Sequence, residues 1–501
     1  MYGFDFKVFF MRMKGKRNLI IIIISLLCIP TFADNNPHII SDSDSASYFK
    51  PDKKPWRAAA IGTGINLGIF GFNRFVTKED FAYVNFKTIK RNLRTWPVWD
   101  SDKLSTNLIG HPYHGSLYYN AARANGYSFY GSLPFTLGGS LMWEFTMENE
   151  PPSRNDLIST TFGGVALGEI TFRLSDLILD NRTSGSNRFF REFFAGLLAP
   201  TRAINRLVTG DAWQYSSNRG NQVQRLPIKG SFLIGGRNVT DHDRTQKYGV
   251  SVKAGVEYGD IFDYEISNPY EWFQTKIQLD YVASRFSLTQ VNVIGALYTR
   301  ELYNKNNLQV FGGFFQHFNY FNSKVIKKNQ KEFRPYYISE AASLGGGVLV
   351  EKEINKFRIE GKYFANGIAL GASISDHFKI DNRDYNMGSG FSLKLHTDLT
   401  YNNKLRFKLR GENYNIYTWK GYDEDLDFKD LTDHEISFLN TQGDRSVARL
   451  YLVGMTAEYD ISDNVYLGVE RFRYIRKTTY KSMPRVSYTA WDDFIHLGFK
   501  F

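Results

Sequence analysis

The mature form of this 501-residue chain is expected to contain no cysteine. Its single cysteine, Cys28, falls in residues 1–33, which have the order of a secretory signal peptide. Basic side chains come first, an apolar run from Leu19 to Cys28 follows, and Thr31-Phe32-Ala33 offers a cleavage site. Lipidation at Cys28 is the alternative, although Leu27 is large for the position before a lipidated cysteine. Disulfides, thiolate metal sites and cysteine nucleophiles are therefore excluded from the exported protein.

Long apolar runs are absent after residue 33. None reaches the roughly 18 residues that a membrane-spanning helix needs, and the mean hydropathy is −0.36. Aromatic residues nevertheless make up 16% of the chain, with 31 Tyr and 41 Phe. A chain that is polar on average and rich in aromatics is typical of a membrane β-barrel, whose strands are apolar on one face only. A soluble β-sandwich shares this composition, so the periodicity of the sequence must decide.

Several catalytic motifs are missing as well. The chain has no G-x-S-x-G, no P-loop, no H-E-x-x-H, and no G-x-G-x-x-G between a strand and a helix. The H-x-x-H of His111 and His114 lacks a fixed third ligand, so it does not predict a zinc site. No cofactor and no metal are therefore expected.

The formal net charge is +11, and it falls to +7 without residues 1–33, which carry five basic and one acidic side chain. An exported protein does not meet nucleic acid, so nucleic acid is not an expected partner. Outer-membrane lipid and lipopolysaccharide, which are anionic, are the natural partners for this charge.

Residues 226–501 alternate apolar and polar side chains with a period of two. Val250 and Val252, for example, alternate with Ser251 and Lys253. This period is the signature of a β-strand, and a charged second face suits a barrel lumen. Runs of this kind predict about twelve strands, with ten or fourteen as alternatives, near residues 226–238, 246–259, 271–284, 287–301, 307–320, 336–351, 357–371, 388–401, 404–418, 447–460, 464–476 and 488–501. The predicted fold is α+β, a membrane-spanning antiparallel β-barrel of about twelve strands preceded by an α-helical domain.

The last strand carries a second signal. Ile495, Leu497, Phe499 and Phe501 share one face, and the chain stops at Phe501. This pattern resembles the C-terminal signature by which the outer-membrane assembly machinery recognises its barrel substrates. That machinery is therefore an expected partner, and the cell outer membrane is the expected location.

The predicted inner face of the barrel is rich in charge, and two interpretations stay open. The charges pair with one another in a water-filled or plugged interior, or the basic ones form a path for anions or lipid headgroups. The residues concerned are Lys253, Lys276, Arg358, Lys362, Arg406, Lys408, Arg410 and Lys500, with Glu257, Asp280, Glu360 and Glu412.

Helical periodicity replaces the period of two in residues 55–210. Linkers 34–54 and 211–225 flank this predicted domain. Small residues recur at helical spacing, which lets helix backbones approach closely. Helices are predicted over 57–73, 112–124, 129–147, 154–180 and 187–207. The domain is expected to plug the barrel, to form a platform beneath it or to lie on the bilayer surface.

Four residues of this domain are candidate catalytic groups: His111, His114, Glu144 and Glu148. Glu144 and Glu148 lie one turn apart on a Gly-rich apolar helix, where charges are costly unless they are paired or used. A histidine that meets one of these glutamates would provide a general base. The structural alternative for His111 is that it caps the helix that begins with Pro112.

Six further polar residues are candidates for substrate binding, and each has a structural alternative. Ser153 and Asp156 fit a capping box at a helix start, after two prolines. Glu169 and Arg173 are spaced as an intrahelical ion pair. Asn120 and Arg123 share one helix face and are placed to anchor a neighbouring helix, or Arg123 to hold an anion.

Three segments of this domain point to a family. They are H-P-Y-H-G at 111–115, W-E-F-T-M-E-N-E-P-P-S-R-N-D at 143–156 and G-G-V-A-L-G-E at 163–169. Together they resemble an uncharacterised family of Gram-negative envelope proteins, known as a domain of unknown function. The resemblance implies a location in the envelope and no particular activity.

Three functions are compatible with these observations. The first is a non-enzymatic outer-membrane barrel with a helical plug or platform, serving transport, assembly or integrity of the envelope. The second is a membrane-embedded hydrolase or acyl-transfer enzyme, acting on lipid A or phospholipid through a His/Glu site. The third is an adhesin or receptor that uses the predicted loops 372–387 and 419–446. The sequence leaves open whether the chain is an enzyme.

Overall fold

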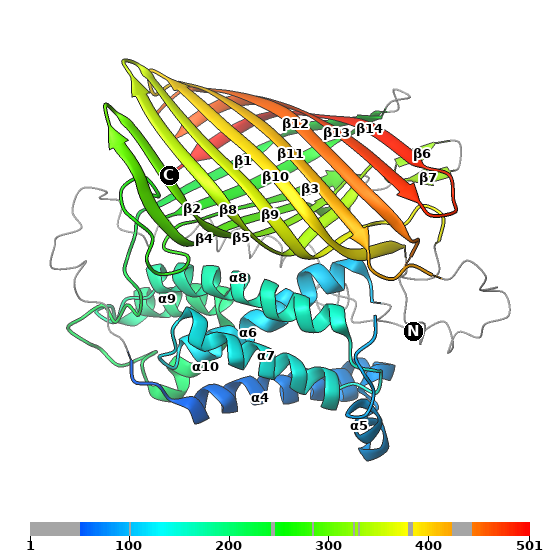
Figure 1. Ribbon diagram of the computed structural model, residues 1–501. Helices are drawn as coiled ribbons and strands as arrows, with labels where there is room; N and C mark the ends of the chain where they lie inside the picture. The colour runs from blue at the N-terminus through cyan, green and yellow to red at the C-terminus, as the bar shows by residue number, and fades with distance from the viewer. Residues whose placement is uncertain are drawn as a thin grey trace. The chain divides into compact units, whose positions relative to one another are not determined.

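The computed structural model describes residues 51–99, 102–241, 246–282, 285–323, 326–328, 331–378, 384–422 and 443–501. The predicted signal peptide, Cys28, most of the predicted linker 34–54 and most of loop 419–446 lie outside these residues. The described part of the chain divides into two compact units, one ending at Pro227 and one starting at Ile228. The first unit is helical and the second is a β-barrel (Figure 1).

The helical unit holds seven α-helices in its described residues. They are α4 (Pro55–Phe72), α5 (Phe86–Asn92), α6 (His111–Arg123), α7 (Phe129–Thr146), α8 (Arg154–Ile178), α9 (Gly185–Leu198) and α10 (Pro200–Thr209), with short turns η1 (Asn73–Thr77), η2 (Asp80–Ala82) and η3 (Thr106–Gly110). The helix predicted over 187–207 is wrong as one element. It breaks into α9 and α10 because Pro200 has no backbone N–H to continue the hydrogen-bond ladder. In the described residues no helix is both long and apolar enough to span a membrane.

Helices α6 and α8 approach each other so closely that only glycine fits between them. A Cβ atom on Gly115 would lie 1.9 Å from the carbonyl oxygen of Thr160 and 2.9 Å from the Cα of Gly164. A Cβ on Gly164 would in turn lie 2.6 Å from the backbone of Gly115. The small residues that the sequence places on these helices therefore set the backbone spacing of the helical unit.

Replacing Gly115 by Ala is expected to destabilise the helical unit by about 3 kcal/mol, because the added methyl group meets backbone atoms that cannot rotate away. Gly68→Ala in α4 is the matched control, since a Cβ there has no neighbour within 4 Å. The control is expected to be neutral or to stabilise by up to about 1 kcal/mol. Urea unfolding followed by the helical circular dichroism signal checks both, and equal midpoints for the two variants would contradict the packing argument.

The barrel unit is a closed sheet of twelve antiparallel strands, as the sequence predicts. Its strand order is β1-β14-β13-β12-β11-β10-β9-β8-β5-β4-β3-β2, and β6 and β7 form a separate hairpin. The strands are β1 (Ile228–Asp241), β2 (Gln246–Tyr258), β3 (Phe273–Val282), β4 (Arg285–Lys305), β5 (Leu308–Asn322), β6 (Ile326–Lys328), β7 (Lys331–Phe333), β8 (Tyr337–Ile354), β9 (Phe357–Ile374), β10 (Tyr385–Tyr401), β11 (Leu405–Thr418), β12 (Ser446–Asp460), β13 (Val465–Tyr480) and β14 (Val486–Lys500).

At one end of the barrel neighbouring strands are connected by short turns, and this end is called the short-turn end. Asn402 and Asn403, predicted as a tight turn, have φ values of 49° and 55°. Asn306 and Asn307 both have a φ of 55°. Two successive left-handed residues make the type I′ turn, whose twist matches that of paired strands, and asparagine tolerates this conformation.

The two faces of the barrel wall differ in polarity. On β12 exposed and buried side chains alternate. Val453 and Met455 are each 62% exposed, whereas Leu450 and Leu452 on the opposite face are buried. The same alternation leaves many large apolar side chains exposed along the outer surface, Ile495 and Phe407 among them. The outer face is therefore apolar, while charged side chains gather on the inner face.

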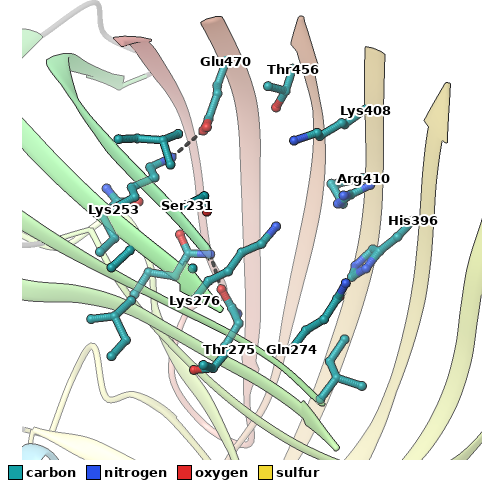
Figure 2. Close-up of a pocket in the computed structure, with 18 of the residues that line it drawn as sticks. Ser231, Lys253, Gln274, Thr275, Lys276, His396, Lys408, Arg410, Thr456 and Glu470 are labelled. Carbon is teal, nitrogen blue, oxygen red and sulfur yellow. Dashed lines mark hydrogen bonds and ion pairs between the residues drawn. The ribbon is translucent and has the colours of Figure 1, made fainter. Parts of the chain in front are cut away.

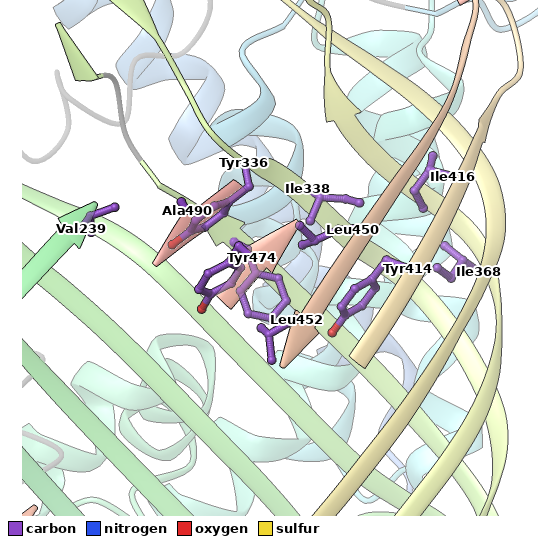
Figure 3. Close-up of a cluster of buried hydrophobic side chains, with 11 residues drawn as sticks. Val239, Tyr336, Ile338, Ile368, Tyr414, Ile416, Leu450, Leu452, Tyr474 and Ala490 are labelled. Atoms are coloured by element: carbon purple, nitrogen blue, oxygen red, sulfur yellow. The ribbon is translucent and has the colours of Figure 1, made fainter. Parts of the chain in front are cut away.

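The lumen is crossed by a cluster of buried side chains, here called the lumen cluster (Figure 3). The ring of Phe321 on β5 lies 5.7 Å from that of Tyr414 on β11 and 6.4 Å from that of Tyr474 on β13. Strands β5 and β13 stand six places apart in the twelve-strand order, so they face each other across the barrel. The cluster consists of Val239, Phe321, Tyr336, Ile338, Ile368, Tyr414, Ile416, Leu450, Leu452, Tyr474 and Ala490.

A second buried cluster fills part of the short-turn end. The connection from β2 to β3, residues 259–272, turns its apolar side chains onto the inner faces of β4, β5, β8 and β9. Trp272 is fully buried, and its ring lies 6.3 Å from that of Phe315. Two backbone hydrogen bonds fix this connection to β4. Tyr270 N–H donates to Ala296 O (2.7 Å), and Ala296 N–H donates to Trp272 O (2.9 Å).

Candidate functional site

The predicted site residues of the helical unit fall into two groups in the structure. His111, Asp156, Ser153 and Glu144 gather around the first turn of α8. A second group forms around Glu169, in the middle of the same helix. Of the remaining predicted residues, His114 and Asn120 form hydrogen bonds between helices, and Glu148, just past the end of α7, accepts one from Trp143 of that helix.

His111 lies against two aspartates. Its Nε2 atom is 3.2 Å from Asp156 Oδ1 and 3.6 Å from Asp102 Oδ2. The carboxylates beside His111 are thus aspartates, while Glu144 and Glu148, the glutamates predicted to meet a histidine, bind Ser153 and Trp143. Asp102 was not foreseen, because nothing in the segment before α6 marks it until the fold brings it to His111.

His114 is part of a buried contact between α4, α6 and α7. Its Nε2 lies 2.7 Å from the Tyr118 hydroxyl and 3.1 Å from Asn66 Oδ1, and its ring meets that of Trp143 edge-on at 4.8 Å. Burial, with a smaller contribution from His111, lowers the pKa of His114 to about 3. His114 is therefore neutral near pH 7, which suits a packing role in the helical unit.

The two predicted glutamates have different environments. Glu144 is 1% exposed, and its Oε2 accepts the backbone N–H of Ser153 at 2.8 Å. Glu148 accepts a hydrogen bond from the indole N–H of Trp143 (2.5 Å). Burial raises the pKa of Glu148 well above its ordinary value, and repulsion from Glu144 and other carboxylates adds to this. Glu148 therefore favours its protonated form.

The N-terminus of α8 has the predicted serine cap without the full capping box, since the backbone N–H of Ser153 binds Glu144 and not Asp156. Ser153 is the N-cap residue, and its hydroxyl oxygen accepts the backbone N–H of Asp156 at 3.2 Å. Asp156 lies in the first helical turn, where the helix dipole stabilises a negative charge. The cap therefore serves the fold and also fixes the position of the Asp156 carboxylate beside His111.

Glu169 is the centre of a buried ion network. Its carboxylate accepts two hydrogen bonds from Arg123 (2.8 and 3.0 Å), one from Arg173 (2.8 Å) and one from the Tyr119 hydroxyl (2.8 Å). The predicted pair of Glu169 and Arg173 is confirmed, and Arg123 joins it from α6. Asn120 donates to Thr171 Oγ1 at 3.0 Å and links the same two helices. These contacts join α6 to α8, so they account for the four residues without a substrate.

The barrel contains a cavity of about 350 Å³ on its inner face (Figure 2). It extends from Phe321 and Tyr474 of the lumen cluster to Lys229, which is exposed at the short-turn end. A cavity of this volume is at the small end of the range for small-molecule sites. Its charged lining residues are Lys229, Lys253, Lys276, Lys362, Lys394, Lys408, Arg410, Glu257, Glu360, Asp398, Glu412, Glu458, Glu470 and Asp492.

Most of these charges are paired, as the first of the two sequence interpretations predicts. Lys408 binds Glu458 (2.7 Å), Arg410 binds Asp398, and Lys362 lies 3.8 Å from Glu257. The pair of Lys362 and Glu257 joins β9 to β2, five places apart in the strand order. Ion pairs therefore also cross the lumen, and this one lies beside Trp272 of the second buried cluster, whose ring centroid is 5.5 Å from Lys362 Nζ.

Lys276 is different from the other lining cations. Among the residues that the structure describes it has no carboxylate within ion-pair distance. Its side chain is exposed to the cavity and points toward the side that carries Arg410 (Figure 2). An ammonium group in this position attracts an anion.

Residues 96–201 match a protein family described as a domain of unknown function (DUF3943). The resemblance that the motifs of the helical unit indicate is thereby confirmed. This match covers part of the helical unit and assigns it no activity. No curated protein is detectably similar to the chain.

Solved structures of outer-membrane proteins show low similarity to this chain. OmpT of Vibrio cholerae is 9% identical, with a TM-score of 0.23 over 55% of this chain and 97% of that one. The toluene transporter TodX of Pseudomonas putida is 7% identical, with a TM-score of 0.21 over 55% and 88%. The outer membrane channel DcaP of Acinetobacter baumannii is 8% identical, with a TM-score of 0.22 over 55% and 96%. At these values they say nothing about what this chain binds or transports.

Proposed function

We propose that this chain is an integral outer-membrane protein that moves a small anionic solute through a barrel closed at rest. The apolar outer face supports the membrane location, because a soluble protein rarely exposes so much contiguous apolar surface. Lipid and lipopolysaccharide are the partners that such a face would contact. The apolar outer face of β14, which carries Ile495 and Phe499, supports recognition by the assembly machinery.

The lumen cluster is the observation that carries the proposal. Side chains from opposite walls meet in the lumen cluster, so the barrel differs from a permanently open, water-filled pore. On its other side lies a charged cavity with Lys276 as the cation without an ion-pair partner in the described residues. A binding cavity behind an apolar constriction is the arrangement expected of a gated transporter.

The barrel's own side chains leave little free space in its lumen. One turn of an α-helix is about 5.4 Å long and, with its side chains, about 10–12 Å in diameter. It therefore needs more room than the cavity offers. The cavity measures about 350 Å³, and the barrel's own side chains occupy the lumen beyond it.

Replacing Lys276 by Gln is expected to weaken anion binding by about tenfold or more, since a charge-assisted hydrogen bond contributes about 1.5–3 kcal/mol. The measurement is calorimetric titration of the full chain in detergent with inorganic phosphate and with citrate as probes. Lys404→Gln is the control, because Lys404 is exposed next to the Asn402-Asn403 turn. Binding that survives in the Lys276 variant, or no binding by the wild type to either probe, would sink the solute proposal.

Two specific observations favour the enzyme alternative. His111 and Asp156 form an imidazole–carboxylate pair, and the raised pKa of Glu148 suits a proton donor. Envelope lipids from a deletion strain, a wild-type complement and a complement with His111→Ala and Glu148→Gln test it by mass spectrometry. An altered lipid A or phospholipid shared by the deletion and the double variant, with the variant still folded, would favour the enzyme; identical profiles would remove it for lipid substrates.

A further inference from the structure

Three donor atoms of different elements converge in the helical unit. They are His111 Nε2 at the start of α6, Asp156 Oδ1 in the first turn of α8, and Asp102 Oδ2 in the segment before η3. All three donor atoms lie within 4.8 Å of one another. One imidazole and two carboxylates from separate parts of the chain are a donor set that divalent cations use.

The spacing of the donors fits a shared ion. Two donors that sit about 2.1 Å from a tetrahedral ion lie about 3.4 Å apart. The measured separations from His111 Nε2 are 3.2 Å to Asp156 and 3.6 Å to Asp102. Both separations are close to this value, and the two carboxylate oxygens lie within 4.8 Å of each other.

We propose that Asp102, His111 and Asp156 bind one first-row divalent transition-metal ion, with Zn²⁺ as the representative. The imidazole nitrogen favours such an ion over Mg²⁺ and Ca²⁺, which take oxygen donors. Three protein ligands leave a fourth position for water, as in catalytic rather than structural zinc sites. This site does not depend on the proposed transport by the barrel.

The surroundings of the three residues support a bound cation. Asn155 donates its side-chain N–H to Asp156 Oδ1 at 3.0 Å and to Asn107 Oδ1 at 2.6 Å, so its amide group orients the Asp156 carboxylate. The side chains of His111 and Asp156 are 11% and 4% exposed, which limits competition by water. Asp102 is 26% exposed and leaves a route for the ion.

The local electrostatics point the same way. Burial first, and then repulsion from Glu144, Glu150 and Asp102, raise the pKa of Glu148. Carboxylates in this part of the helical unit are thus close enough to repel one another. A divalent cation at Asp102 and Asp156 would relieve that repulsion.

A metal-free alternative has the same geometry. In that state His111 is protonated and forms an ion pair with both aspartates. The two states differ in what they bind: the metal site takes up one ion per chain, and the imidazolium takes up none. Titration of the wild type with the ion therefore separates the two states. Replacing an aspartate by the isosteric asparagine then tests that residue as a ligand without removing side-chain volume.

The test uses the full chain in detergent, stripped with EDTA and titrated with Zn²⁺ in a calorimeter. We expect one ion per chain and a weakening of more than about 100-fold in Asp156→Asn and in His111→Ala. Co²⁺ in place of Zn²⁺ is expected to give the strong visible absorption of a tetrahedral site. His377→Ala controls for adventitious binding, because His377 is an exposed histidine of the barrel unit.

Two results would overturn the site: no stoichiometric uptake by the wild type, or equal uptake by wild type and Asp156→Asn. Circular dichroism of each variant checks that the helices persist. If His111→Ala unfolds the helical unit, Asp156→Asn and Asp102→Asn decide the outcome, since both keep the shape of the side chain.

Discussion

Removing the rings of Phe321 and Tyr474 together is expected to turn a closed barrel into a conducting one. The two rings approach to 6.4 Å from opposite walls, and Tyr474 also stacks on Tyr336 at 4.0 Å. A narrow apolar constriction blocks ions because it is not filled with water. A wider gap that remains hydrated lets ions pass. The charged cavity on the short-turn side of the cluster would supply the rest of the path.

The measurement is ion conductance of the purified chain in planar lipid bilayers. The wild type is expected to be nearly silent, and Phe321→Ala with Tyr474→Ala is expected to raise conductance by at least about tenfold. Phe407→Ala with Tyr459→Ala removes two rings from the outer face, where Phe407 is 45% and Tyr459 is 55% exposed, and serves as the control. Heat-dependent migration on gels verifies that each variant still forms a barrel.

Two outcomes would contradict a closed lumen. A wild type that already conducts steadily would show that the cluster is no barrier. A silent double variant that still migrates as a folded barrel would place the barrier elsewhere, and the ion pair of Lys362 with Glu257 would be the next one to break.

Replacing Glu169 by Gln is expected to destabilise the helical unit by about 3–5 kcal/mol, the cost of breaking a buried ion pair from one side. The side chain of Glu169 is fully buried, and those of Arg123 and Arg173 are 11% and 4% exposed. Without the carboxylate two guanidinium groups stay buried next to each other. Urea unfolding of the full chain, read from the helical signal, measures the loss.

The matched control is Glu192→Gln. Glu192 also binds two arginines, Arg188 and Arg206, each at 2.8 Å, but its side chain is 16% exposed. Both of these arginines also donate to backbone carbonyls, at Ala212 and Asp211, which remain after the substitution. The expected loss is about 1–2 kcal/mol. Losses of the same size in both variants would contradict the role of burial.

The same carboxylate makes the helical unit sensitive to acid. Burial alone would raise the pKa of Glu169, but Arg123 and Arg173 outweigh it and hold the pKa below its ordinary value of 4.5. The stabilisation is therefore complete above that ordinary value and is lost as the pH falls through the folded-state pKa. Unfolding midpoints measured from pH 7 downward are expected to drop more steeply for the wild type than for Glu169→Gln.

Strands were the most predictable part of this molecule. An apolar face that alternates with a polar or charged one marks most of the barrel strands in the sequence, and β2 shows this alternation from Val250 to Glu257. Helix starts were predictable where a cap exists, as at Ser153. Helix α5 was overlooked although Asn85 and Thr88 form a capping box, because its seven residues are too few to show a period.

The features that depend on distant residues were not predictable. The connection over 259–272 has the composition of a surface loop, yet the barrel gives its apolar side chains an inner surface to cover. The pairing of charges inside the lumen follows from strand order, as for Lys362 and Glu257. Asp102 became a candidate only once α6 and α8 brought His111 and Asp156 to it.

The seam between β1 and β14 has a consequence for the order of folding. Arg237 and Asp492 meet across it although 255 residues separate them, whereas most other neighbouring strands are joined by short hairpins. Loop-closure entropy therefore makes the seam the last pairing to form. Until then the growing sheet carries two unpaired edges, which are sites for pairing with other chains. The buried ion pair of Arg237 and Asp492 would stabilise the pairing of β1 with β14, which eliminates both unpaired edges in one step.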